Sequence, residues 1–154
     1  MEQTNRRRME MEEPPGTCAF CSIVRGEGTA RIIFEDAEAM AFLDARLFSG
    51  HCLLIPKSHY ETMFDLPEDL VGRMFIKARR LAKIVQEVMN AEGALVAVNN
   101  RVSQSVPHLH IHIVPRRRGD RLRVFFWPRF RYESQEQLNE VQKALSVRAK
   151  NGVF

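Results

Sequence analysis

The chain contains 154 residues, of which 45% are hydrophobic and 27% are charged, and its formal net charge at pH 7 is +4. This composition is that of a single soluble domain with a real core. It excludes a membrane-spanning protein, because no apolar run approaches the roughly 20 residues that a membrane helix needs. The charged N-terminus lacks the apolar segment of a secretory signal, and three cysteines are an odd number for a disulfide scaffold. We therefore expect a cytoplasmic protein without a membrane partner.

The positive charge is concentrated in residues 116–131, which hold seven arginines and a single acid, Asp120. The remainder of the chain consequently has a net negative charge. A local excess of positive charge raises the concentration of an anionic substrate beside it. A solvated basic loop would also explain the arginines, and we do not expect nucleic acid to be the partner.

The first 16 residues combine charged side chains with prolines and show no period that would bury one face. We expect a disordered tail there. A short helical turn is expected over residues 18–24, because a glycine follows closely. Two apolar runs, residues 30–34 and 39–43, predict strands. Only a short turn separates these strands, so they are expected to form a hairpin with an apolar inner face.

A third strand is expected at residues 52–56, where Pro56 ends the run because proline cannot donate to a ladder. A long helix is expected over residues 68–89, with Pro67 as a start signal and Gly93 as a stop. Its apolar positions recur at helical spacing and include Leu70, Met74, Ala78, Leu81 and Val85.

Two further strands are expected at residues 94–99 and 109–114, and the short polar stretch between them favours antiparallel pairing. A capping-box pattern at Ser134 opens a short amphipathic helix through Leu145. Strands followed by segregated helices, with one long helix, predict an α+β fold. We divide the chain into three parts: a tail (1–16), a domain (17–120) and a C-terminal extension (121–154).

The run from Val106 to Pro115 alternates histidines with aliphatic residues. On an extended strand, this period of two places alternate side chains on opposite faces. One face would carry His108, His110 and His112, and the other Leu109, Ile111 and Ile113. A single histidine on a strand is usually a surface residue or a hydrogen-bonded core residue. Three neutral imidazoles on one face are costly unless a metal, a phosphate or hydrogen bonds occupy them, so a chemical site is expected here.

The run Gln104-Ser105-Val106-Pro107-His108-Leu109-His110-Ile111-His112 resembles the signature of the histidine triad (HIT) proteins, which are nucleotidyl hydrolases and transferases. The similarity extends over residues 18–118 and includes Phe42-Leu43-Asp44, Gly50-His51 and Ile55-Pro56-Lys57-Ser58-His59. The resemblance implies a HIT-like fold, with a five-stranded antiparallel sheet that carries helices. It also implies a homodimer.

By this resemblance, His110 is the nucleophile that attacks the α-phosphorus of a nucleotide and holds the nucleotidyl group until water removes it. A neutral imidazole suits this role, because its pKa of about 6.5 leaves one ring nitrogen free near neutral pH. The other nitrogen must be held as a donor. The resemblance assigns that task to the carbonyl of His112, and it implies that His51 packs against His112 as support.

The resemblance places Gln104 and Ser105 at the α-phosphate and the bridging oxygen, where their donors would stabilise developing charge. Asn99 is similar to a phosphate-contacting asparagine, although Asn100 beside it would take that role after a shift of one residue. The loop between Asn99 and Gln104 is shorter than in the family, and Ser103 stands where the family has glycine. As turn residues alone, these side chains would need no ligand.

The nucleoside end of the site is also implied by the resemblance. Asp44 matches an acid that accepts hydrogen bonds from ribose hydroxyls, a role suited to the two acceptor oxygens of a carboxylate. The residues that match those around the base are Phe20, Ile23, Phe42 and Leu43. Composition alone would make these four residues part of the core. The substrate implied is an adenine or other purine nucleotide.

Cys18-x-x-Cys21, His59 and His108 offer two thiolates and two imidazoles, the ligand set of a closed tetrahedral zinc site. Several HIT proteins and the related galactose-1-phosphate uridylyltransferases have this set and bind structural zinc. The alternative is two buried free cysteines with His108 hydrogen-bonded instead. We expect zinc and no organic cofactor, which leaves His110 uncommitted as the nucleophile.

The activity implied is cleavage of the α-phosphate linkage in nucleotide conjugates such as dinucleoside polyphosphates, a choice that Gln104 and the segment Arg116–Asp120 favour. One alternative is a nucleoside phosphoramidase. Another is a nucleotide-binding regulatory protein in which turnover is incidental.

The segment Phe125–Arg129 contains two phenylalanines and Trp127, the only tryptophan, and is too apolar for a free loop. Exposed aromatic patches of this kind mark interfaces. By resemblance, Trp127 lies near the phosphate end of a site across a two-fold axis. The alternative is that these aromatic residues cover the chain's own sheet.

Overall fold

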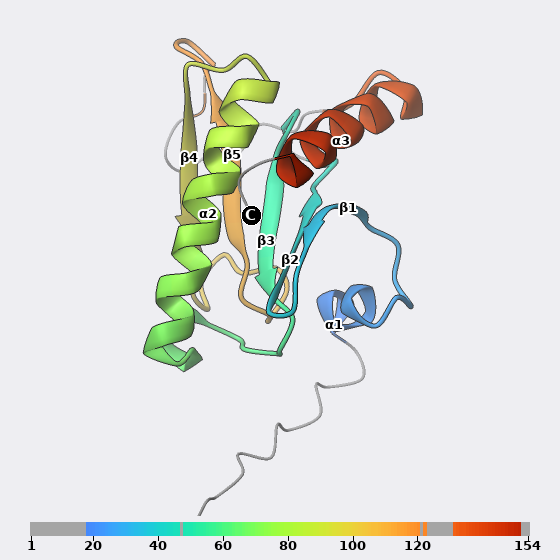
Figure 1. Ribbon diagram of the computed structural model, residues 1–154. Helices are drawn as coiled ribbons and strands as arrows, with labels where there is room; N and C mark the ends of the chain where they lie inside the picture. Colours follow the sequence, from blue (N-terminus) through green and yellow to red (C-terminus); the bar gives the residue numbers. More distant parts are fainter. Residues whose placement is uncertain (1–17, 47, 121, 123–130, 152–154) are drawn as a thin grey trace, which may run out of the picture.

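The computed structural model describes residues 18–46, 48–120, 122 and 131–151. Within these ranges the chain forms one antiparallel sheet in the strand order β1-β2-β3-β5-β4 (Figure 1). The strands are β1 (Arg31–Glu35), β2 (Ala39–Leu43), β3 (Cys52–Pro56), β4 (Gly93–Val98) and β5 (Ile111–Arg116). The helices are α1 (Ala19–Val24), the 3-10 helix η1 (Met63–Asp65), α2 (Glu68–Val88) and α3 (Gln135–Lys150). The expected disordered tail (1–16) and the aromatic segment Phe125–Arg129 with Trp127 lie outside the described residues.

The predicted α+β fold is confirmed, and two strands, β2 and β3, have the predicted bounds. β5 begins at Ile111, two residues later than expected. The reason is that the backbone N–H of Leu109 donates to the carbonyl of Tyr60, 2.6 Å away, and does not join the ladder. The residues just before β5 are therefore held by the loop that follows β3.

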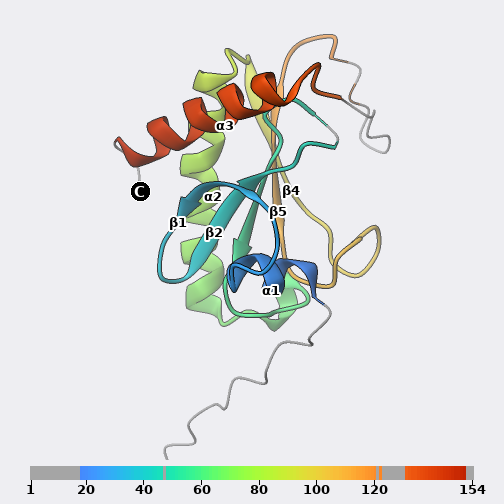
Figure 2. The same ribbon diagram turned by 90° about the vertical axis from the view of Figure 1, so that its right-hand side faces the viewer.

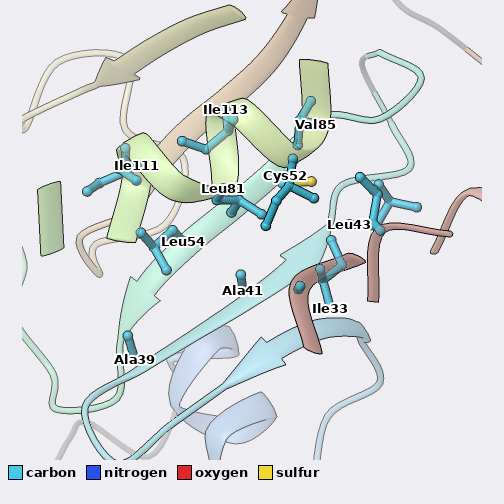
Figure 3. Packing of buried hydrophobic residues seen from close by; sticks show 14 of the residues in the cluster. Ile33, Ala39, Ala41, Leu43, Cys52, Leu54, Leu81, Val85, Ile111 and Ile113 are labelled. Carbon is cyan, nitrogen blue, oxygen red and sulfur yellow. The ribbon is translucent and has the colours of Figure 1, made fainter. Parts of the chain in front are cut away.

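α2 covers one face of the sheet and buries the apolar stripe that its sequence predicts, including Met74, Ala78, Leu81 and Val85. These side chains pack against alternate residues of the strands, among them Ile33, Leu43, Leu54, Ile111 and Ile113 (Figure 3). α3 adds Leu138, Leu145 and Ala149 to the same cluster. In the part of the chain that the structure describes, no helix is both long and apolar enough to cross a membrane.

α1 lies on the opposite face of the sheet (Figures 1 and 2). It forms a second, smaller buried cluster with the side chains of β2 and β3 that point away from α2: Met40, Phe42, Leu53 and Ile55. The ring of Phe20 in α1 also contacts the rings of His108 and His110, with centroids 5.8 and 5.3 Å apart. The alternation expected around β5 is therefore present, because the aliphatic side chains face α2 and the histidines face α1.

α3 begins where the sequence predicts, although it is longer than the short helix expected. The Ser134 hydroxyl accepts a hydrogen bond from the backbone N–H of Gln137 at 3.1 Å. The Gln137 side chain accepts from the N–H of Glu133, and not from that of Ser134, so the capping box is shifted by one residue. Gln142 and Ser146 on α3 both donate to the carbonyl of Ile32, which fastens the helix to the edge strand β1.

Candidate functional site

His110 is the central side chain of the histidine face and is only 3% exposed. Its Nδ1 lies 2.7 Å from the carbonyl oxygen of His108. Because a carbonyl can only accept, Nδ1 carries the proton and Nε2 keeps its lone pair. Burial lowers the pKa of His110, and the bond to His108 opposes this change only partly. The ring is therefore neutral near pH 7 and presents a free nitrogen.

The carbonyl that holds His110 belongs to His108 and not to His112, which corrects the expectation from the sequence. His112 lies inside the sheet, paired with Leu53 on one side and Ala97 on the other. Its backbone groups therefore belong to the ladder. His108 precedes the first residue of β5, so its carbonyl is available to a side chain two residues later.

His112 and His51 form a buried pair beside His110. Nε2 of His51 lies 3.0 Å from Nδ1 of His112, and the two rings are stacked with centroids 5.2 Å apart. The expected contact between these two histidines is therefore present. Burial lowers the pKa of His51 to about 4 and that of His112 to about 3. Both rings are neutral near pH 7, and His112 contacts the ring of His110 at a centroid distance of 4.8 Å.

Asp44 lies at the end of β2, next to this pair. Its backbone N–H donates to the carbonyl of His51 at 2.7 Å, and its Oδ2 is 3.9 Å from Nδ1 of His51. Burial acts to raise the pKa of Asp44. The hydrogen bonds from the backbone and side chain of Arg46, together with its positive charge, outweigh burial, so the pKa is lowered. A charged carboxylate thus lies next to the histidines, with Oδ2 facing the ring of His51.

Two of the four predicted base-packing residues, Phe20 and Phe42, form an apolar wall beside His110. Their rings meet edge to face with centroids 5.4 Å apart. Ile23 packs against the same cluster from α1. Leu43 is a wrong prediction for this wall, because it packs in the α2 cluster on the other face of the sheet (Figure 3). Phe42 and Leu43 are neighbours on a strand, and alternation directs them to opposite faces.

Asn99 and Asn100, in the loop after β4, have different hydrogen-bond partners. The Asn100 side chain accepts from the N–H of Met63 at 2.7 Å and so fastens the loop to η1. Asn99 donates to the carbonyl of Ser103 at 3.2 Å and remains the candidate for a phosphate contact. Ser103 has φ +59°, in the left-handed region that favours glycine. This conformation explains why a glycine is expected at Ser103 from the resemblance.

Gln104 and Ser105 follow in the same loop. The Gln104 amide donates to the carbonyl of Glu61, and its oxygen accepts from the N–H of Arg101 at 2.7 Å. Both ends of Gln104 are therefore engaged by protein groups, and a phosphate contact would require it to exchange one of them. Ser105 is exposed, so its hydroxyl is accessible to a ligand.

The four predicted metal ligands, Cys18, Cys21, His59 and His108, come together with all their ligand atoms within 4.8 Å of one another. Nδ1 of His108 is 3.5 Å from the sulfur of Cys18 and 3.5 Å from that of Cys21, and Nδ1 of His59 is 3.2 Å from the sulfur of Cys21. In tetrahedral zinc sites, bond lengths of about 2.3 Å to sulfur and 2.0 Å to nitrogen place these atoms roughly 3.5 Å apart. The observed spacing matches that geometry.

The tautomer of His108 also suits a metal. Its Nε2 donates to the carbonyl of Pro56 at 2.8 Å, which leaves the Nδ1 lone pair directed at the two sulfur atoms. Burial and the Cys18 thiol raise the pKa of Cys21 to about 11, so this thiol needs a cation beside it to lose its proton near pH 7. The donor set therefore fits a divalent metal such as zinc.

Sequence reasoning missed two contacts that shape the site. Tyr132 accepts a hydrogen bond from the N–H of Gly50 at 2.9 Å and fixes the turn that leads into His51. Gly50 has φ +76°, and a Cβ there would lie 2.6 Å from the Met89 side chain, so any other residue would be strained. The Gly-His pair is visible in the sequence, whereas no local signal connects Tyr132 to it.

Comparisons with known proteins agree with this geometry. A family model described as the HIT domain matches residues 25–119. A HIT-like protein of Methanocaldococcus jannaschii is 37% identical over 128 residues, which cover 81% of this chain and 98% of the relative. An adenylylsulfatase of Arabidopsis thaliana is 33% identical over 116 residues, covering 73% of this chain and 59% of the relative. An adenosine 5′-monophosphoramidase of Candida albicans is 32% identical over 108 residues, which cover 66% of this chain and 71% of the relative.

Among solved structures, a Zn-bound histidine triad family protein from Mycobacterium smegmatis is similar with a TM-score of 0.74. It is 34% identical, and the match covers 88% of this chain and 98% of that protein. A hypothetical histidine triad nucleotide-binding protein from Sulfolobus tokodaii is 29% identical with a TM-score of 0.75, over 87% and 93% of the two chains. The similarity therefore spans the sheet and the helices that carry the site.

The buried histidine pair predicts a stability that falls in acid. Below pH 6.5 the unfolded chain takes up protons at His51 and His112, whereas the folded protein binds none until the pH approaches about 4 and about 3. The folded pKa values are the lower ones, so stability is lost as the pH falls. Each proton that only the unfolded chain binds lowers the free energy of unfolding by up to about 1.4 kcal/mol per pH unit. Urea unfolding between pH 7 and pH 5 measures the slope, which should be smaller for His112→Asn; a flat free energy of unfolding would contradict the prediction.

Proposed function

Because this chain belongs to the histidine triad (HIT) family, we propose that it is a nucleotidyl hydrolase or transferase that works through a covalent intermediate on His110. The observation that carries the proposal is the bond between Nδ1 of His110 and the carbonyl of His108. This bond leaves Nε2 as a neutral nucleophile in a site that also contains the carboxylate of Asp44. A nucleophile of this kind needs no separate base to activate it.

The proposed reaction has two steps. In the first, Nε2 of His110 attacks the α-phosphorus, a P–N bond forms, and the bond to the leaving group breaks with its electron pair on that group. In the second, water attacks the same phosphorus, the P–N bond breaks with its electron pair returning to Nε2, one proton of the water passes to solvent, and the mononucleotide leaves. Gln104 and Ser105 are the proposed donors to the phosphate oxygens, as the family resemblance implies. His51 orients His112, which packs against the nucleophile.

The proposed substrates are adenine nucleotide conjugates with a good leaving group on the α-phosphate. Two relatives support the adenylyl part by their names, an adenylylsulfatase and an adenosine 5′-monophosphoramidase. Their leaving groups differ, which fits a site that recognises the adenylyl part. We favour dinucleoside polyphosphates, because Gln104 and the segment Arg116–Asp120 resemble the branch of the family that acts on them. Adenosine phosphoramidates are the second candidate, which the monophosphoramidase relative favours.

A panel of three conjugates tests the substrate class: adenylyl sulfate, adenosine 5′-phosphoramidate and diadenosine triphosphate. Release of AMP from at least one of them is expected, and the relative kcat/KM values rank the leaving groups. A regulatory protein that only binds nucleotides would bind AMP without turning over any of the three. The panel thus separates enzyme from binding protein.

We further propose that Cys18, Cys21, His59 and His108 hold a structural zinc ion. When bound, zinc would supply folding energy by joining α1 to the segment that carries the histidines. The Zn-bound relative from Mycobacterium smegmatis supports this assignment. His110 is not one of the four ligands, so its Nε2 stays free for the substrate.

A second copy of this chain is the proposed protein partner. β4 is an edge strand of the described sheet, it contains only apolar residues, and Val96 is 39% exposed. An apolar edge of this kind is a surface on which another strand can pair. A homodimer built on β4 would bury it and is consistent with the dimer that the family resemblance implies.

Replacing His110 by Asn should reduce turnover to background while AMP binding is retained. The reason is that the ribose and phosphate contacts do not depend on the imidazole, whereas the P–N bond does. Calorimetric titration with AMP and initial rates with the best substrate of the panel measure the two properties on the same preparation. A variant that folds like the wild type and still turns over substrate well above background would remove His110 as the nucleophile.

Replacing Asp44 by Ala should weaken AMP binding by roughly 1 to 3 kcal/mol, because hydrogen bonds to the ribose hydroxyls are lost. These contacts act equally on ground state and transition state, so kcat should change less than KM. Asp44→Asn is the matched control, since it keeps the size and one acceptor and should lose less affinity. An AMP affinity that is unchanged in Asp44→Ala would place the ribose elsewhere.

Protein purified without chelator should contain about one zinc ion per chain, and removing it should lower the melting temperature. Elemental analysis and thermal unfolding provide the two measurements. Cys18→Ser should lose the metal, whereas Cys52→Ala should keep it, because Cys52 lies in the α2 cluster away from the other two cysteines. A wild-type protein of normal stability without metal would contradict the assignment.

A further inference from the structure

Arg46 follows Asp44 by two residues and lies against its carboxylate. The backbone N–H of Arg46 donates to Oδ1 of Asp44 at 3.0 Å, and Nε donates to the same oxygen at 3.3 Å. The Asp44 side chain is 5% exposed, whereas that of Arg46 is 74% exposed. One edge of the guanidinium is thus anchored at a buried carboxylate. The terminal amino groups remain accessible to a ligand that binds beside Asp44.

This arrangement differs from the other arginine pairs of the described residues. Arg73 and Arg148 pair with Asp69 and Glu87, carboxylates that are themselves 70% and 38% exposed. In every other arginine pair of the described residues, the carboxylate is at least 24% exposed. Arg46 instead shares a carboxylate with the proposed ribose site, and only Oδ1 of that carboxylate accepts from it.

The Asp44 carboxylate also places Arg46 near the histidines. Oδ2 of Asp44 is 3.9 Å from Nδ1 of His51, whose ring stacks on that of His112. Arg46 donates to Oδ1 of the same carboxylate and therefore lies beside this histidine pair. A nucleotide that placed its ribose on Asp44 and its α-phosphate at His110 would have Arg46 beside the ribose.

Building on the proposed function, we propose that Arg46 binds a phosphate group on the ribose, so that the preferred substrates are adenylyl conjugates phosphorylated at the 2′ or 3′ hydroxyl. A carboxylate alone favours a free diol and repels a ribose phosphate. In dinucleotide sites an acid binds the free ribose hydroxyl, and an arginine takes over where the ribose carries a 2′-phosphate. Arg46 brings this second kind of group beside Asp44 and offsets the negative charge of its carboxylate. The planar guanidinium donates in parallel to two phosphate oxygens, which a lysine cannot reproduce.

The test compares the binding of AMP, adenosine 3′,5′-bisphosphate and adenosine 2′,5′-bisphosphate by titration calorimetry. The wild type should bind one of the two bisphosphates about tenfold or more tightly than AMP, as a charge-assisted contact provides. Which bisphosphate binds more tightly identifies the phosphorylated hydroxyl. Arg46→Gln should abolish the ratio, and Arg46→Lys should keep part of it. Arg80→Gln removes the same charge from an exposed position on α2 and should leave the ratio unchanged.

A wild type that binds AMP but neither bisphosphate more tightly would overturn the inference, and so would an Arg46→Gln variant that keeps the wild-type ratio. Each of these results leaves the proposed function intact, because AMP still binds. A wild type that binds none of the three nucleotides would instead contradict the proposed function itself, and the inference with it. The ratio is the deciding quantity, since Arg46 also orients Asp44 and its loss changes all three affinities together.

Discussion

The carbonyl oxygen of His108 is the constraint on which the candidate site depends, because it determines which nitrogen of His110 carries the proton. The same residue directs its ring at Cys18 and Cys21, and its Nε2 is held by the carbonyl of Pro56. One residue therefore connects the candidate metal-binding cluster to the proposed nucleophile. A shift of His108 would disturb both the thiol cluster and the tautomer of His110. A metal bound by this cluster would therefore influence His110 through the position of His108, without taking part in the reaction itself.

The second constraint is that the site is buried between the sheet and α1. His51, His108, His110 and His112 are each at most 8% exposed, and burial is the main cause that keeps their pKa values below the ordinary one. Low polarity also strengthens the hydrogen bonds that orient the rings. Burial makes a polar partner valuable to each ring: His51 and His112 contact each other, His110 donates to the carbonyl of His108, and His108 donates to that of Pro56. The neutral state of His110 and the fixed orientation of the neighbouring rings therefore both result from burial.

Much of the fold could be predicted from the sequence, because alternation and helical spacing are local properties. The bounds of β2 and β3, the stripe on α2 and the histidine face all follow from them. The carbonyl that holds His110 could not be predicted, since the start of β5 depends on a contact of Leu109 with distant Tyr60. The engagement of Gln104 by the Glu61 carbonyl is likewise a tertiary contact. The prediction for Leu43 was wrong for a different reason: the resemblance grouped it with Phe42, although strand alternation places the two side chains on opposite faces.

The central claim is that the nucleotide becomes bonded to His110. Diadenosine triphosphate labelled in its α-phosphates, mixed with the protein and quenched in alkali within the first turnover, tests it most directly. Phosphorus–nitrogen bonds of this kind survive base and break in acid, so digestion under alkaline conditions should yield a labelled peptide that contains His110 and loses its label in acid. Substrate turnover with no label on that peptide, or with acid-stable label on another residue, would contradict the account.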